Sequence, residues 1–191
     1  MTRNITLIIL FLFALNLYPI ATSKQYDNWK VKTIVYDGTD KKTVTMSLNL
    51  DEKLEVYIAS RQEQLNITIT WYKDKINNDD AVISYYFDNK QTTEIEPIVR
   101  SEKNNFDILY TISPSFGIVQ EDEIINFFRD LINHTTMTIK PYRESKNVYN
   151  IDLKGIKEAI EYTDFSNTLF DKYKTSILNA QEPDILQLGI P

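Results

Sequence analysis

The alternation of apolar and polar residues in the first half of the chain predicts β-strands. In residues 43–50 every second residue is apolar, and residues 65–72 repeat this pattern with Trp71 as the last inward residue. A period of two places one set of side chains on a buried face and the other in water. Segments rich in β-branched and aromatic residues predict further strands at 29–36, 54–58, 82–88 and 106–112. We expect turns at 37–40 and 75–80, where Gly, Asn and Asp gather.

After Pro114 the period lengthens and predicts helices. In residues 121–133 the apolar positions are three and four apart, and the acidic residues Glu121, Asp122 and Glu123 stand where the helix dipole favours negative charge. Strand-like alternation returns at 135–142 and 148–153. Further helices are expected from near Gly155 and around 169–178. The expected fold is therefore α+β and mainly β, with an antiparallel β-sandwich-like core, a mid-chain helix and C-terminal helices.

The N-terminus reads as a secretory signal peptide. Arg3 precedes an apolar run over residues 5–15, and Ala21 and Ser23 are the small residues that signal peptidases require. We therefore expect residues 1–23 to be removed after Ser23. The run is shorter than the roughly 20 apolar residues of a bilayer span, so we expect no stable membrane anchor after cleavage.

Composition limits what the processed chain does. We expect one β-rich binding domain over residues 24–180 and a flexible tail over 181–191, which has few packing signals. The absence of cysteine excludes lipoprotein attachment and disulfides. A net charge of −6 disfavours nucleic acid as a partner. The predicted signal peptide favours a periplasmic or secreted protein.

The residues that carry chemistry do not form a recognisable catalytic or metal motif. His134 is the only histidine, which leaves no usual zinc set and no Cys/His pair. We expect His134 to interact with the end of the preceding helix rather than to act as a base. The acidic runs 79–80 and 121–123 lack the spacing of a calcium loop and are interpreted as a solvated turn and a helix start. The sequence thus predicts no catalytic, cofactor-binding or metal residues, and no enzyme.

Two observations leave alternatives open. Two carboxylates can meet from anywhere in a fold, so a hydrolase that uses a glycosidase-like pair stays an alternative. Asn66 and Asn133 each begin a glycosylation tripeptide, which matters only in a eukaryotic secretory pathway.

The order of features resembles the periplasmic accessory proteins of type VI secretion called TagO or VasI. The similar features are an early Trp29, the strand 66–71 that ends in Trp71, the segment 85–88, the helix near 121–131, and the strand, glycine and helix of 151–160. Members of that family commonly carry cysteines, which this chain does not have. The secreted invasion-associated locus B type of β-sandwich is similar to a lesser degree. The resemblance implies a β-sandwich with packed helices and an accessory role in a secretion or cell-envelope assembly.

The expected function is that of an exported, non-catalytic module that binds an unidentified protein partner through an edge strand or an aromatic surface. Twelve tyrosines favour this, because a tyrosine ring buries area while its hydroxyl stays solvated. The alternative is a secreted effector or host-interaction protein on the same fold, which recovery from culture medium would favour.

Overall fold

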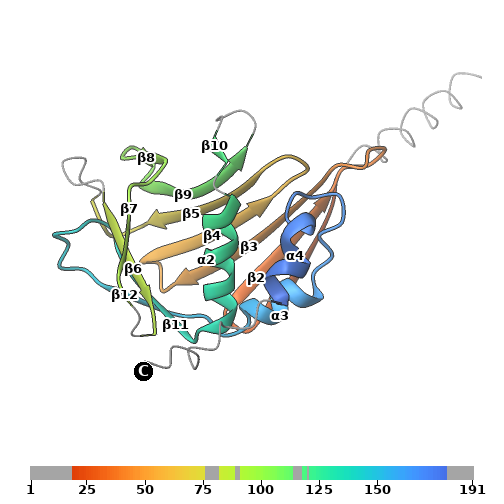
Figure 1. The fold of residues 1–191 in the computed structure, drawn as a ribbon. Helices are drawn as coiled ribbons and strands as arrows, with labels where there is room; N and C mark the ends of the chain where they lie inside the picture. The colour runs from red at the N-terminus through yellow and green to blue at the C-terminus, as the bar shows by residue number, and fades with distance from the viewer. Residues whose placement is uncertain (1–18, 76–81, 89–90, 114–117, 120, 180–191) are drawn as a thin grey trace, which may run out of the picture.

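Two antiparallel sheets form the framework of the protein (Figure 1). The structure is a computed structural model that describes residues 19–75, 82–88, 91–113, 118–119 and 121–179. The larger sheet consists of β1 (Ile20–Tyr26), β2 (Trp29–Val35), β3 (Lys42–Leu50), β4 (Leu54–Ser60), β5 (Leu65–Trp71), β9 (Phe106–Ser113) and β10 (Ile118–Val119) in that order, and β8 (Val99–Ser101) also pairs with β9. The smaller sheet has the order β12 (Tyr149–Asp152), β11 (Thr136–Lys140), β6 (Ile83–Phe87) and β7 (Thr93–Ile95).

Three helices lie against these sheets in the described part of the chain. Helix α2 (Glu121–Asn133) crosses the face of the larger sheet, with α3 (Ile156–Tyr162) and α4 (Asp171–Leu178) beside it (Figure 1). The buried residues of α2 follow the predicted spacing of three and four and form its inner stripe, namely Ile124, Phe127, Phe128, Leu131 and Ile132. The expected α+β, mainly β fold is confirmed, and the mid-chain helix has the predicted bounds.

The strongest predicted strand forms the centre of the core. In β5 the inward residues Leu65, Ile67, Ile69 and Trp71 are all fully buried, as the alternation predicted. The two sheets contact each other at the inward face of this strand, where the ring centroids of Trp71 and Tyr149 of β12 are 5.9 Å apart. The inward face of β5 is therefore core rather than a binding surface.

Aromatic rings from both sheets surround α2. Phe127 of α2 contacts Tyr85 and Phe87 of β6 and Tyr110 of β9, with ring centroids 5.3–5.8 Å apart. The hydroxyls of Tyr85 and Tyr110 lie 2.6 Å apart, so each buried hydroxyl has a partner. Burial raises the pKa of both phenols above the ordinary value. This cluster joins the small sheet to the large one.

A buried ion pair sits beside Trp71. Asp107 of β9 is fully buried, and its Oδ1 accepts a hydrogen bond from Arg100 Nε at 2.8 Å. Its Oδ2 accepts hydrogen bonds from Trp71 Nε1 at 2.8 Å and from an Arg100 terminal nitrogen at 3.1 Å. The same terminal nitrogen of Arg100 donates to the carbonyl of Pro141 at 2.8 Å. The cluster satisfies a buried charge and ties β8, β9 and β5 together.

The N-terminal hairpin is fastened to the start of α3 through Gly155. Gly155 has a φ of +93°, and a Cβ at this position would lie 2.1 Å from the carbonyl oxygen of Tyr26. Only glycine fits such an approach. The neighbouring Lys154 adds an ion pair from its Nζ to Asp27 Oδ1 at 3.1 Å. The turn between β1 and β2 is thus held against the C-terminal half of the chain.

The structure differs from the sequence-based expectation chiefly at the N-terminus. Residues 20–26 form β1, which pairs with β2 in full register, although the sequence suggested a signal peptide up to Ser23 and no strand. The short strands β7, β8 and β10 were also not predicted. Residues 1–18, the Asp79–Asp80 turn and the expected tail 181–191 lie outside the described residues. No helix in the described ranges is long and apolar enough to cross a membrane.

Candidate functional site

His134 packs as a core residue. Its side chain is only 8% exposed and lies edge-on to Phe87, with ring centroids 5.5 Å apart. Neither ring nitrogen has a hydrogen-bond partner among the described residues, whereas the backbone N–H donates to the carbonyl of Asp130 at 3.2 Å. The expected side-chain interaction with the helix end is thus replaced by ring packing, because the chain turns the imidazole inward after α2.

The acidic start of α2 has a structural partner. Glu121 Oε1 accepts hydrogen bonds from Lys172 Nζ and from the Tyr173 hydroxyl, each at 2.5 Å. The bond from Lys172, followed by that from Tyr173, lowers the pKa of Glu121. These contacts fasten α2 to α4. Across the described ranges, no three His, Asp or Glu side chains are placed to hold a metal ion.

Asp88, which follows β6, is also structural. Its carboxylate accepts hydrogen bonds from the backbone N–H and the hydroxyl of both Thr135 and Thr136, at 2.8–3.3 Å. Burial alone would raise the pKa of Asp88, but these bonds outweigh it and hold the pKa well below its usual range. Asp88 therefore clamps β6 to the start of β11.

The two glycosylation tripeptides lie in different surroundings. Asn66 is half-buried in β5, and its Oδ1 accepts a hydrogen bond from the Thr111 hydroxyl at 2.6 Å. Asn133 is exposed at the end of α2. Only Asn133 has the open position that a glycan needs.

A groove at the N-terminal edge of the large sheet is the candidate site. Figure 1 shows the first strands reaching beyond the helices. The groove has a volume of about 300 Å³ and runs between the inner faces of β1, β2 and β3 and the loop that joins α3 to α4. Its lining consists of Thr22, Lys24, Tyr26, Val31, Thr33, Val35, Lys42, Tyr162, Thr163 and Asp164.

Exposed apolar side chains gather at this groove. Tyr162 at the end of α3 is 65% exposed and Val35 at the end of β2 is 41% exposed, and both line the groove. Ile20, the strand partner of Val35, is 64% exposed. Solvent-facing large apolar side chains that cluster in this way are typical of interaction surfaces.

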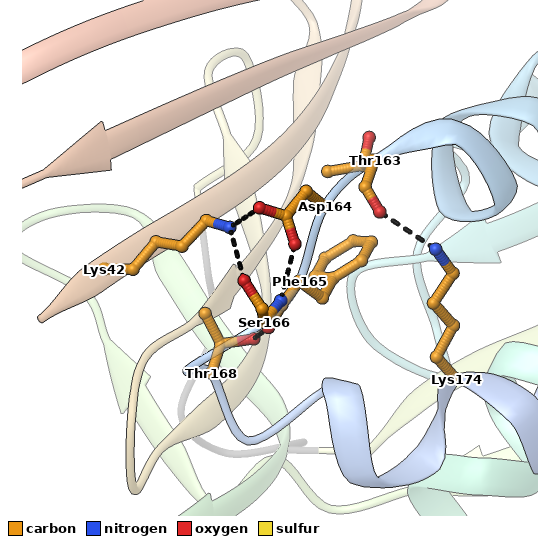
Figure 2. Close-up of polar contacts among 7 residues, drawn as sticks. All are labelled: Lys42, Thr163, Asp164, Phe165, Ser166, Thr168 and Lys174. Carbon is orange, nitrogen blue, oxygen red and sulfur yellow. Dashed lines mark hydrogen bonds and ion pairs between the residues drawn. The ribbon is translucent and has the colours of Figure 1, made fainter. Parts of the chain in front are cut away.

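The wall formed by the α3–α4 loop is rigid. Phe165 and Phe170 anchor it in the core with ring centroids 4.5 Å apart. Thr168 closes a local turn, because its hydroxyl donates to the carbonyl of Phe165 at 2.8 Å. Lys174 of α4 donates to the carbonyl of Thr163 at 2.9 Å (Figure 2). It also donates to the carbonyl of Glu161 at 2.9 Å. The groove therefore has one preformed side.

Lys42 connects this wall to the sheet (Figure 2). The Lys42 side chain is only 8% exposed, and its Nζ contacts Asp164 Oδ2 at 2.5 Å and Ser166 Oγ at 3.3 Å. Asp164 Oδ1 also accepts the backbone N–H of Ser166 at 2.9 Å. The bond from Lys42, followed by those from Ser166, lowers the pKa of Asp164 to about 2. Asp164 is thus a fixed anion at neutral pH.

This pair makes stability depend on pH. Because the folded pKa of Asp164 lies below its ordinary 3.8, its contribution is present above that value and is lost as the pH falls towards 2. The Asp164 side chain is 75% exposed, so water screens the pair and we expect no more than about 1 kcal/mol. In urea unfolding, the free energy of unfolding of Asp164→Asn should be lower than that of the parent at pH 6 and equal to it near pH 2.

The matched control is Asp51→Asn. Asp51 lies 3.9 Å from Lys53, and its side chain is 81% exposed. We expect this change to shift stability by less than about 0.3 kcal/mol at pH 6. A gap between Asp164→Asn and the parent that persists unchanged at pH 2 would contradict the assigned role of the carboxylate.

Sequence reasoning did not identify the residues of this groove. Lys42 and Asp164 are 122 positions apart, so no local spacing indicates that they meet. A local signal for the hairpin of β1 and β2 is Asp27-Asn28, a turn-forming pair directly before the alternating residues of β2.

No family model, curated protein or solved structure matches this chain.

Proposed function

We propose that this chain is an exported, non-catalytic module that binds a protein partner of a secretion or cell-envelope assembly at the groove beside β1. The observation that carries the proposal is the pair of exposed apolar side chains of Val35 and Tyr162, which line the groove and remain after cleavage. A tyrosine with most of its ring in water is the residue type that anchors many protein interfaces.

The rigid wall supports a role in recognition. A surface that is already ordered loses little conformational entropy when a partner docks, so more of the contact energy appears as affinity. Lys174, Phe165 and Phe170 hold the α3–α4 loop in place before any partner arrives. The groove is open and continuous with a sheet edge, which suits an extended polypeptide.

The charges of the groove support a binding role over a catalytic one. A general base must take up a proton near neutral pH. Asp164, with a pKa of about 2, does not do so, and Lys42 is held as its ion-pair partner. These two groups fix the shape of the groove.

Export is part of the proposal and has its own test. The leader over residues 1–23 would direct the chain out of the cytoplasm and be removed after Ser23. N-terminal sequencing of the protein from its native host should give Lys24 as the first residue. A membrane-bound form that begins with Met1 would contradict export with cleavage.

Crosslinking tests the binding site directly. A photo-reactive amino acid at position 162 should crosslink a protein partner in the native host, whereas one at position 72, where Tyr72 is 47% exposed elsewhere on the surface, should not. Tyr162→Ala should weaken capture of the crosslinked partner about tenfold or more and change the free energy of unfolding by less than about 0.5 kcal/mol. Equal crosslinking from both positions, or unchanged capture by Tyr162→Ala, would rule out this groove as the docking site.

A further inference from the structure

We propose that removal of the leader opens a strand-wide slot along the outer half of β2, and that an extended segment of the protein partner fills it by adding a strand to the large sheet. This inference rests on the proposed function, including cleavage after Ser23. It names how the partner is recognised, which the groove alone does not.

The cleavage site falls in the middle of a paired strand. Ile20, Ala21, Thr22 and Ser23 pair with residues 32–35 of β2, while only Lys24, Gln25 and Tyr26 of β1 follow the bond to be cut. Cleavage after Ser23 therefore leaves a short β1 next to the turn. Beyond it, the outer half of β2 becomes the edge of the sheet.

The turn shows which backbone groups are freed. Tyr26 and Trp29 close a two-residue turn, and such a closing pair exchanges both of its backbone hydrogen bonds. Hydrogen-bonded pairs recur at every second residue of an antiparallel ladder. Thr33 and Val35 are therefore the residues of β2 whose N–H and C=O groups face the leader. Without the leader, these groups form an open edge.

The edge keeps its strand form after cleavage. Residues 30–35 of β2 pair along their other side with residues 42–47 of β3. Residues 20–23 are all exposed, so their loss removes little buried apolar area from the domain. An ordered strand with unpaired N–H and C=O groups is a template for another strand.

The displaced residues describe the occupant. Ile20 and Thr22 belong to the inner face of β1, where Thr22 lines the groove and Ile20 is the strand partner of Val35. An incoming strand antiparallel to β2 would place two alternate side chains there, beside Tyr162. The fitting partner is therefore an extended segment with an apolar side chain at the position of Ile20 and a small or β-branched one at that of Thr22.

A peptide with the sequence of residues 17–25 is the probe. It should bind the processed protein and slow amide hydrogen exchange at Thr33 and Val35 at least about tenfold at saturation, measured by NMR. N-methylation of the peptide at its Thr22 position removes an N–H that faces β2 and should abolish the protection. N-methylation at its Ala21 position, whose N–H faces away, is the matched control and should preserve it.

Two results would overturn the inference. One is slow exchange at Thr33 and Val35 in the processed protein without peptide, and the other is equal protection by both N-methylated peptides. If either occurs while Tyr162→Ala still weakens partner capture, strand addition is wrong and the proposed function stands. The reverse result is that the peptide protects Thr33 and Val35, while Tyr162→Ala captures the partner normally and position 162 gives no specific crosslink. That result contradicts the proposed docking site and supports strand addition at β2.

A variant of the protein tests the same edge with the natural partner. Val35→Pro removes an N–H that faces the slot and leaves the ladder between β2 and β3 intact. Val35→Ala removes the side chain but keeps that N–H. Capture of the crosslinked partner should fall at least about tenfold for Val35→Pro relative to Val35→Ala, and equal capture would overturn the inference.

Discussion

Replacing Trp71 with alanine is expected to lower the free energy of unfolding by about 3–5 kcal/mol. The side chain is fully buried at the end of β5, where it packs against Tyr149 of the small sheet. Its removal leaves a cavity between the two sheets that the surrounding residues cannot fill. It also takes one hydrogen-bond donor from the buried carboxylate of Asp107. Urea unfolding monitored by circular dichroism measures the loss.

Two further variants separate these effects. Trp71→Phe keeps an aromatic ring but removes the donor to Asp107, and we expect a loss of about 1–3 kcal/mol. Tyr72→Ala changes the next residue, which is 47% exposed, and should cost less than about 1 kcal/mol. An unfolding curve of Trp71→Ala that overlays the parent would show that this face of β5 is not the core.

The elements that the sequence predicted are those whose stability is decided locally. β5 alternates without interruption and α2 keeps its apolar stripe over its full length, so the pattern of each element alone indicates the buried face. The bounds of α2 were predicted to the residue because the acidic first turn marks its start. In these elements, propensity and burial favour the same structure.

The elements that were missed depend on distant partners. β7 and β8 have three residues each, which is too short to show a period. β1 is exposed along nearly its whole length, so it has no apolar face to detect, and pairing with β2 alone makes it a strand. The small residues that predict a cleavage site at Ser23 also suit an exposed edge strand, so the sequence of this segment does not distinguish the two interpretations.

The groove was beyond sequence reasoning for the same reason. Lys42 belongs to β3, whereas Tyr162 and Asp164 follow from the end of α3, and only the complete fold brings them together. Lysine and aspartate are usually exposed, so a lysine at the start of a strand and an aspartate after a helix are predicted to lie on the surface. The structure instead buries Lys42 to 8% exposure and uses the pair to join sheet and loop.

Replacing Arg100 with methionine is expected to cost about 3–5 kcal/mol, because it leaves the fully buried Asp107 without its ion-pair partner. The Arg100 side chain is only 6% exposed, so water does not take over its role. The carboxylate would keep the hydrogen bond from Trp71 Nε1, which does not balance a buried charge. Chemical unfolding at neutral pH measures the loss.

The matched control removes both charges. Arg100→Met combined with Asp107→Leu leaves no unpaired ion in the core, so the double variant should be more stable than Arg100→Met alone by at least about 1 kcal/mol. Asp107→Leu alone removes the acceptor for Trp71 Nε1 and Arg100 and should resemble Arg100→Met. If the two single losses simply add in the double variant, Arg100 and Asp107 do not act as a pair. In a coupled buried pair, removing the second charge after the first costs less free energy of unfolding than the sum of the two single losses. Additive losses would therefore mean that the residues stabilise the junction of β5, β8 and β9 by packing and not by their charges.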